Sequence, residues 1–370
     1  MTKRYPLTAP MLGRDDEREV TRAIRSGWLT HSGKYVGEFE RNFSAFSGGK
    51  YGVATSSGTS ALHLALKTIG VGPEYEVIVP SLTYVATASA VMYTRAAPVF
   101  VDVERDTWCV DPAAIARAIT PRTRAIFAVH LYGQPAKMDE INKVAQAHGV
   151  AVVADAAQAH GSLYKKKGIA TTADISVFSF HGSKLITTGE GGMLVTRNVD
   201  LAKRARFLAN HAADSARPYW HGEIGFNYRL TNLQAALGVS QLRKAKQALA
   251  ARDHVAGWYD EFLRGRDGHG GLELNPVVKD TRTNHWMVCV LLPKGGPSVD
   301  TIRAALARKG IETRPFFSPV HTLPPFAGCR TVGDLSVSVD LSERGLALPT
   351  GSHISKRDVR IISTALLSLL

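Results

Sequence analysis

The sequence predicts an α/β protein with a large domain built on a doubly wound, mostly parallel sheet, followed by a small α+β domain. Between residues 51 and 196, short apolar runs alternate with helical segments of roughly ten residues, which is typical of parallel sheets covered by helices on both faces. At 370 residues, the chain can bury more than one core. We expect the large domain at 1–245 and the small domain at 246–370, with the N-terminal segment a candidate to pack on the small domain.

The strands of the large domain are predicted from runs of β-branched and aromatic residues. They are expected at residues 51–55, 76–80, 97–103, 123–130, 150–155, 175–180 and 192–196. Helices are expected at 15–26, 35–46, 61–69, 111–119, 138–148 and 200–210, with another opening at 81–87. The first helix has three acidic residues in its first turn and Gly27 after its end, which is the arrangement that helix termini favour.

The rest of the chain mixes helices and strands. A long helix at residues 232–251, or one that breaks near Ala250, is expected to link the two domains. Further elements are expected as a strand at 285–292, a helix at 298–309, an extended segment at 311–317, a strand at 346–350 and a closing helix at 356–370. We interpret this region as an α+β unit that caps the functional site.

The chain is strongly basic, with 45 Lys and Arg against 32 Asp and Glu and a formal net charge of +13. The basic residues are dispersed, and the densest runs, at 165–167 and 243–246, are short. No helix-turn-helix, zinc or aromatic RNA-binding motif accompanies them, so nucleic-acid binding is disfavoured. The charge suits anionic small ligands instead.

The sequence also predicts a cellular setting. No apolar run reaches the length of a membrane span, and the N-terminal segment lacks the apolar core of a signal peptide. We therefore expect a cytoplasmic protein without membrane attachment. Cys109, Cys289 and Cys329 are scattered and odd in number, which favours free thiols in a reducing compartment and no metal site.

The segment 173–196, ADISVFSFHGSKLITTGEGGMLVT, places one lysine between two apolar strands. Burial would lower the pKa of Lys184 and leave the neutral amine that attacks carbonyl groups. Ser179 and Ser183 offer hydroxyl groups nearby, and the glycines let a ligand approach the backbone. From this segment alone, a lysine that forms a Schiff base and a surface lysine in a glycine-rich hairpin are equally supported.

A second motif favours the Schiff-base lysine. The apolar strand at 150–155 ends in Asp155, and ligands of parallel sheets bind beyond the carboxyl ends of the strands. Pyridoxal 5′-phosphate (PLP) requires a lysine for its Schiff base and an acidic partner for its pyridinium nitrogen. Lys184 and Asp155 supply these two groups.

The two motifs resemble those of the DegT/DnrJ/EryC1/StrS family of sugar aminotransferases. Further resemblance lies in the loop GWLTHSG at 27–33, the turn SSGTSAL at 56–62, PSLTY at 80–84 and GFNYRLTNLQAA at 225–236, so it covers nearly the whole chain. Ser57 departs from the family's usual asparagine and Ala154 from its usual glutamate. The resemblance implies a fold-type I PLP-dependent transferase with a sheet of the seven-stranded type, active as a homodimer with shared sites.

The resemblance also implies individual roles. Lys184 would bind the cofactor and move protons, and Asp155 would hold the pyridinium nitrogen. The turn that opens the helix after residue 55 would bind the phosphate, a role that a strand, a small-residue turn and a helix N-terminus also suggest. Tyr84 would stack on the ring, its alternative being a core aromatic. The implied cofactor-binding set is Ser57, Gly58, Thr59, Tyr84, Asp155, Gln158, Ser179, Lys184 and, reaching into the neighbouring subunit, Asn227.

For substrates, the resemblance implies L-glutamate as amino donor and a keto-sugar nucleotide as acceptor. Its motif pattern favours GDP-4-keto-6-deoxymannose, with a dTDP- or UDP-linked keto-sugar or a keto-cyclitol as alternatives. A non-catalytic PLP-binding protein or a basic binding protein is the alternative from a different class. Candidate substrate contacts are Thr30, His31, Arg229, Arg314 and His321; structural roles are the alternative for Arg314 and His321.

Overall fold

A central sheet organises the computed structural model, which describes residues 3–264 and 272–370. Within these residues the sheet has eight strands, in the order β1 (Tyr51–Thr55), β9 (Gly192–Thr196), β8 (Ile175–Ser179), β5 (Ala151–Asp155), β4 (Thr123–Val129), β2 (Glu76–Pro80), β3 (Ala97–Val101) and β14 (Thr331–Val332). The strands from β8 to β14 pair in parallel, and β9 pairs antiparallel with both β1 and β8. The predicted mostly parallel sheet is confirmed.

The sheet exceeds the expected seven strands by one. Seven strands come from the first 245 residues, and β14 is added from the C-terminal part of the chain by parallel pairing of Thr331 with Phe100. The sequence pattern missed β14 because the described strand has only two residues, too few to show a period.

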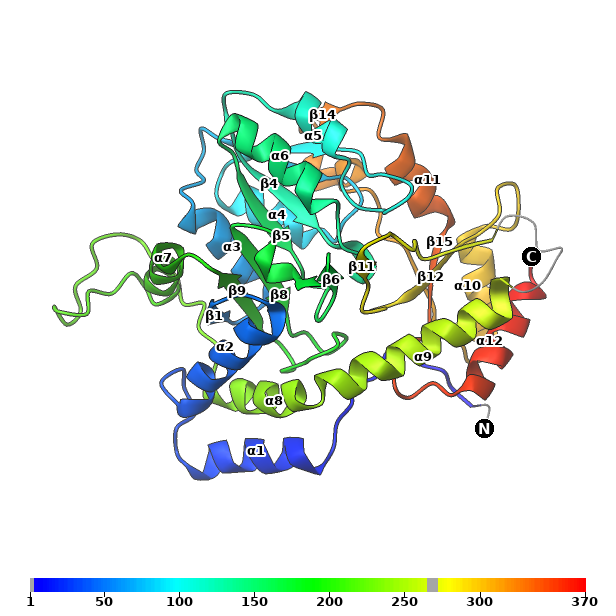
Figure 1. Ribbon diagram of the computed structural model, residues 1–370, viewed down its shortest axis with the longest axis horizontal. Helices are drawn as coiled ribbons and strands as arrows, with labels where there is room; N and C mark the ends of the chain where they lie inside the picture. The colour runs from blue at the N-terminus through cyan, green and yellow to red at the C-terminus, as the bar shows by residue number, and fades with distance from the viewer. Residues whose placement is uncertain (1–2, 265–271) are drawn as a thin grey trace.

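Helices cover both faces of the sheet (Figure 1). Val77 and Val79 pack with α3 (Gly58–Thr68), α4 (Ala86–Tyr93) and α7 (Val199–Ala209), whereas Ile78 packs with α5 (Pro112–Ala118) and α6 (Met138–His148). This alternation follows from the two-residue period of a strand. Farther along the sheet, α2 (Lys34–Ser47) and α8 (Asn232–Arg243) bury Phe178 and Phe180, and α1 (Arg14–Arg25) packs on α8.

Two helix starts differ from the expectation by three residues or more. Helix α3 begins at Gly58 rather than residue 61 because Ser57 caps it, its Oγ accepting a hydrogen bond from the backbone N–H of Ser60 at 3.0 Å. Helix α4 begins at Ala86 rather than at 81, after a connection that is not helical.

The expected continuous helix at 232–251 and its alternative, a break near Ala250, are both wrong, because the chain bends at Lys244 instead. Helix α8 ends at Arg243, and α9 (Ala245–Arg264) continues unbroken toward the C-terminal part of the molecule (Figure 1). The Lys244 Nζ donates hydrogen bonds to the backbone oxygen of Met11 at 2.7 Å and to Asp16 at 2.5 Å. A tertiary contact therefore accompanies this bend, and no glycine or proline marks it in the sequence.

The C-terminal part holds a second, antiparallel sheet. Its strands are β10 (Glu273–Leu274), β12 (Val288–Leu291), β15 (Gly345–Leu348) and β13 (Arg314–Pro315), packed with α9, α10 (Val299–Arg308) and α12 (Lys356–Leu367). A small third sheet joins β11 (Thr281–Arg282), β6 (Leu163–Tyr164) and β7 (Lys167–Gly168). Tyr5 forms a bridge with Ile311. The boundary at 245/246 stays a prediction.

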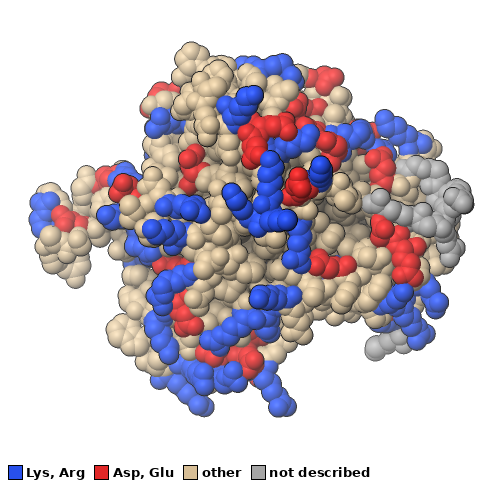
Figure 2. Space-filling view, viewed as in Figure 1, with Lys and Arg blue, Asp and Glu red and all other residues tan. Residues whose placement is uncertain are grey.

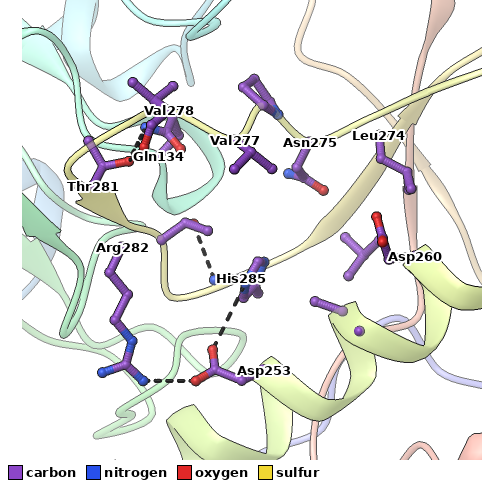
Figure 3. A pocket seen from close by; sticks show the side chains of 15 residues that line it. Gln134, Asp253, Asp260, Leu274, Asn275, Val277, Val278, Thr281, Arg282 and His285 are labelled. Carbon is purple, nitrogen blue, oxygen red and sulfur yellow. Dashed lines mark hydrogen bonds and ion pairs between the residues drawn. The ribbon is translucent and has the colours of Figure 1, made fainter. Parts of the chain in front are cut away.

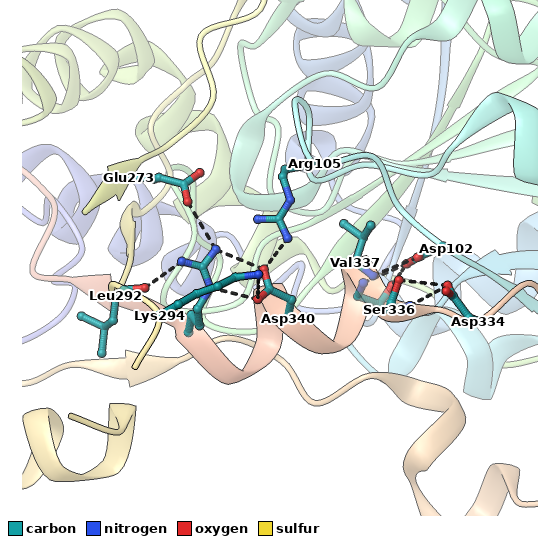
Figure 4. Close-up of polar contacts among 11 residues, drawn as sticks. Asp102, Arg105, Glu273, Leu292, Lys294, Asp334, Ser336, Val337 and Asp340 are labelled. Atoms are coloured by element: carbon teal, nitrogen blue, oxygen red, sulfur yellow. Dashed lines mark hydrogen bonds and ion pairs between the residues drawn. The ribbon is translucent and has the colours of Figure 1, made fainter. Parts of the chain in front are cut away.

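A polar clamp fixes α11 (Ser336–Arg344), a helix that the sequence did not reveal, to the loop after β3 (Figure 4). The Asp102 carboxylate accepts hydrogen bonds from the backbone N–H groups of Val337 at 3.0 Å and Ser338 at 2.8 Å. Arg105 and Arg344 bind Asp340. Burial alone would raise the pKa of Asp340, but these two guanidinium groups lower it to about 2.

Candidate active site

A cavity of about 380 Å³ opens where β5 and β8 end and α3 begins. Among its lining residues are the sequence-predicted Ser57, Gly58, Thr59, Tyr84, Asp155, Gln158, Ser179, Lys184 and Arg314. They come from the ends of β5 and β8, from the connections that lead into α3 and α4, from the loop between β8 and β9, and from the C-terminal part of the chain. The fold therefore brings together groups that lie far apart in the chain.

Lys184 lies in the loop that joins the antiparallel strands β8 and β9. Its backbone N–H donates to the His181 oxygen at 2.9 Å, and its Nζ lies 4.0 Å from the centre of the Trp286 ring. Burial lowers the pKa of Lys184 to about 8, although the Asp155 carboxylate acts in the opposite direction. A sizeable fraction of the Lys184 amine is consequently neutral near physiological pH.

Asp155 ends β5 and is almost fully buried, with 6% of its surface exposed. Its Oδ2 accepts a hydrogen bond from the Thr87 hydroxyl at 2.7 Å, and its Oδ1 accepts one from the backbone N–H of Ala157 at 3.1 Å. Burial nevertheless raises the pKa of Asp155. A positively charged ligand would stabilise the ionised carboxylate. Thr87 was not identified from the sequence, since only the fold places it against Asp155.

The N-terminus of α3 forms one wall of the cavity. The Ser57 side chain caps this helix, and the backbone N–H groups of Gly58 and Thr59 lie in its first turn, where no intrahelical acceptor exists. A Cβ on Gly192 would lie 2.3 Å from the Ser57 oxygen, so β9 approaches the helix start as only glycine allows. Free N–H groups and the helix dipole make this end suitable for an anion.

Aromatic rings line the opposite side of the cavity. Tyr84 is 53% exposed, and its ring centre lies 5.6 Å from that of Phe317. Phe317 stacks on Tyr132 at 5.6 Å with an interplanar angle of 7°. Phe317 and Trp286, which also line the cavity, were missed in the sequence. Trp286 falls inside the expected strand 285–292, but the strand begins only at Val288 because His285 has a left-handed backbone, with φ of 46°.

The predicted substrate contacts do not come together within one chain. Of these residues, Arg314 lines the cavity. The His321 ring lies 2.6 Å from the Ser81 hydroxyl, and Thr30 is exposed in a loop whose backbone accepts a hydrogen bond from Asn232. His31 and Arg229 line a separate cavity of about 180 Å³, with 3.5 Å between their side chains.

Asn227 also lies away from the Lys184 cavity. Its side-chain oxygen accepts a hydrogen bond from Arg229 Nε at 3.0 Å. The segment that precedes it extends from the body of the molecule beyond α7 (Figure 1) and exposes Tyr219 and Ile224 almost completely. Eight of the nine predicted cofactor-binding residues therefore line the Lys184 cavity, and Asn227 does not.

A larger cavity, of about 510 Å³, lies between α9 and the segment 274–288 (Figure 3). None of the sequence-predicted site residues lines it. Its Asp253 carboxylate pairs with Arg282 at 2.8 Å and lies 3.9 Å from His285, so this charge is compensated. We place the functional site in the smaller cavity, where the chemically reactive groups are.

Within residues 3–264 and 272–370, no helix combines the length and the apolar character needed to cross a bilayer. Nor do three or more His, Cys, Asp or Glu side chains of the described residues form a group that could hold a metal ion.

Comparison with known proteins identifies the family. The model of the DegT/DnrJ/EryC1/StrS aminotransferase family matches residues 10–367. The chain belongs to this family. The predicted enzyme class and fold are therefore confirmed.

This aminotransferase has relatives of known name. It is 42% identical to GDP-perosamine synthase from Caulobacter vibrioides, over 98% of this chain and 97% of the relative. It is 38% identical to GDP-perosamine synthase from Escherichia coli O157:H7, over 96% of each. Its structure is similar to DesI, solved in the presence of its TDP-sugar product, with a TM-score of 0.93 and 32% identity over 100% of this chain and 93% of DesI.

Proposed function

We propose that this aminotransferase binds PLP in the Lys184 cavity and transfers the amino group of L-glutamate to GDP-4-keto-6-deoxymannose, forming GDP-perosamine. The convergence of Lys184, Asp155 and the N-terminus of α3 on one cavity carries this proposal. The names of the two relatives support the choice of acceptor.

The cavity fits PLP group by group. Asp155 is buried, and burial raises the pKa of its carboxyl group. A protonated pyridine nitrogen would compensate the negative charge of this carboxylate. The first turn of α3 would bind the phosphate through the N–H groups of Gly58 and Thr59. Lys184 offers the amine for covalent attachment, and the exposed ring of Tyr84 offers a flat face.

Each residue then has a chemical task. Bound PLP supplies the electron sink that makes the Cα–H bond of an amino acid acidic. Asp155 keeps the pyridine nitrogen charged, and Thr87 orients the carboxylate through its hydrogen bond. The free Lys184 amine would move a proton from Cα of L-glutamate to C4′ of the cofactor in the first half-reaction and from C4′ to C4 of the sugar in the second. Arg314, at the cavity wall, is a candidate to bind an anionic group of either substrate.

We infer that a second copy of the chain completes the site. Asn227, Arg229 and His31 lie outside the Lys184 cavity, which supports a role in the neighbouring subunit. The exposed side chains of Tyr219 and Ile224, on the segment that projects from the body, provide apolar area for such contact.

The test is the visible absorption spectrum of the protein with PLP, before and after L-glutamate. We expect a band of covalently bound PLP, its loss on adding L-glutamate, and its return with GDP-4-keto-6-deoxymannose. A Lys184→Ala variant should lose at least about 1000-fold in transamination, whereas Lys166→Ala, at an exposed lysine, should not. A folded protein that forms no such band would refute the proposal.

The same assay discriminates among acceptors. Return of the band with a dTDP- or UDP-linked keto-sugar or a keto-cyclitol, and not with the GDP-sugar, would keep the chemistry and change the substrate. Salt-dependent nucleic-acid binding without PLP would instead favour a basic binding protein. Against that alternative, the face in Figure 2 shows Lys and Arg interspersed with Asp and Glu rather than gathered in one patch.

A further inference from the structure

The indole of Trp286 lies against the Lys184 amine. The Nζ is 4.0 Å from the ring centre, and only 6% of Trp286 is exposed. Within the described residues, the Nζ makes no hydrogen bond or ion pair, and the Trp286 ring is its close neighbour.

The ring is fixed without help from the lysine. Its Nε1 donates to the Ser183 oxygen at 2.9 Å, and its backbone N–H donates to the side-chain oxygen of Asn284 at 2.9 Å. Asn284 is fully buried, and its amide donates to the Gln158 and His160 oxygens at 2.9 and 3.1 Å. The indole is thus held directly by the loop between β8 and β9, and its backbone is held, through Asn284, by the loop that follows Asp155.

The backbone of this segment is anchored on its other side too. His285, next to the indole, has a left-handed backbone, which is uncommon for a residue other than glycine. Asp253 of α9 pairs with Arg282 and lies near His285 (Figure 3). Strain of this kind persists only where the surroundings impose it, and it often accompanies a functional position.

We propose that Trp286 is a positioning residue for the catalytic amine: its indole face holds the Lys184 ammonium whenever that amine is not covalently occupied. Indole is the best aromatic partner for a cation, and the interaction strengthens when both groups leave water. Asp155 cannot serve this purpose alone, because Thr87 and Ala157 already bind it and its proposed partner is the cofactor. The proposal rests on the proposed function of Lys184.

Other charged groups act on the same amine. Asp155 at the end of β5 favours the ammonium, and Arg252 of α9 disfavours it. The cavity wall adds His181, Glu190 and Arg314, and the neutral, buried ring of His160 lies behind the site. The substitutions below leave all of these groups in place, so their effect on the amine is common to every variant.

The experiment measures the Lys184 pKa in the full-length, cofactor-free protein by competitive acetylation with acetic anhydride from pH 6 to 10, quantified by peptide mass spectrometry. Both Trp286→Phe and Trp286→Leu lose the Nε1 hydrogen bond, but only Phe keeps a ring face. We expect the pKa to fall in the order wild type, Phe, Leu, with the Leu variant about one unit lower. Trp108→Phe, at another buried tryptophan, whose ring contacts Phe316 rather than Lys184, should leave the Lys184 pKa unchanged.

The sign of the shift separates positioning from packing. If Trp286 only excluded water, its loss would hydrate the ammonium and raise the pKa, and that result, or equal values in the Phe and Leu variants, would overturn the proposal. Exposed Lys166, read from the same digests, corrects for general reactivity. The readout requires no PLP, so failure of the spectral test refutes the proposed function, whereas PLP binding without the expected order refutes only the role of Trp286.

Discussion

The two halves of the proposed site are built differently. The cofactor half is complete within one chain: Lys184, Asp155 and the start of α3 surround a single cavity. The substrate half is scattered, since Arg229 and His31 line another cavity and His321 is bound to Ser81. Groups that lie at the ends of neighbouring strands meet because the sheet brings them together. We infer that Arg229 and His31, which lie outside this cavity, reach a site only when a second copy of the chain is bound.

This difference predicts that the cofactor half responds most strongly to single substitutions. We expect Asp155→Asn to lower transamination by roughly 100-fold or more, because it removes the buried charge that we propose pairs with the pyridinium nitrogen. The measurement is kcat/KM with L-glutamate at saturating PLP. Thr87→Val, which removes one hydrogen bond to the same carboxylate, should cost about tenfold or less. Equal losses in both variants would contradict the charge argument.

Burial of the Lys184 amine in the cofactor half predicts a specific pH dependence for the capture of PLP. Because burial lowers the pKa of Lys184 to about 8, the neutral amine increases as pH rises and is nearly complete above that value. The rate of PLP capture by cofactor-free protein should therefore rise about tenfold per pH unit below 8 and level off above it. Stopped-flow absorbance from pH 6 to 10 measures this, with N-acetyl-lysine methyl ester as the exposed-amine reference. A rate that rises throughout, as for that reference, would show an ordinary lysine.

Mixing two inactive variants tests whether the substrate half belongs to the neighbouring subunit. Lys184→Ala and Asn227→Ala chains, unfolded and refolded together in equal amounts, should regain up to about a quarter of wild-type activity. Half of the dimers are hybrids, and each hybrid has one intact site. Each variant refolded alone is the control. No recovery in mixtures that exchange subunits would assign Asn227 to its own chain.

The smallest effect concerns the polar clamp that fixes α11 to the loop after β3. Asp340→Asn should lower Tm by roughly 2–4 °C at pH 7, because Arg105 loses its carboxylate partner and Arg344 keeps only Glu273. The folded-state pKa of about 2 lies below the ordinary value of 3.8, so this stabilisation is complete above pH 4 and is lost as pH falls toward 2. The Tm difference from wild type should shrink accordingly. Asp300→Asn, in an exposed pair with Arg303, should change Tm little.

Local patterns were sufficient where a segment's own residues decide its structure. The run ending in Asp155 forms β5, and Met138–His148 is helical over the expected residues. They failed where a distant partner decides. The bend at Lys244 is accompanied by contacts with Asp16 and Met11, and β14 exists through β3.

The same distinction holds in the site. Lys184 and Asp155 follow from the chemistry of their own segments, and both line the cavity. The place of Trp286 in the site does not follow from its own segment, because it depends on the left-handed backbone at His285 and on the buried amide of Asn284. In the sequence it resembles the start of an ordinary apolar strand, and nothing local marks it as a neighbour of the amine.

The pairing of β14 with β3 has a consequence for how the protein is made. During synthesis, β3 is complete long before residues 331–332 leave the ribosome, so one border of the large sheet remains uncovered while most of the chain is translated. An uncovered strand border can pair with other chains, and closing a contact across more than two hundred residues is slow. A nascent chain that stops before residue 331 therefore keeps the border of β3 unpaired, and we expect chaperones to bind there.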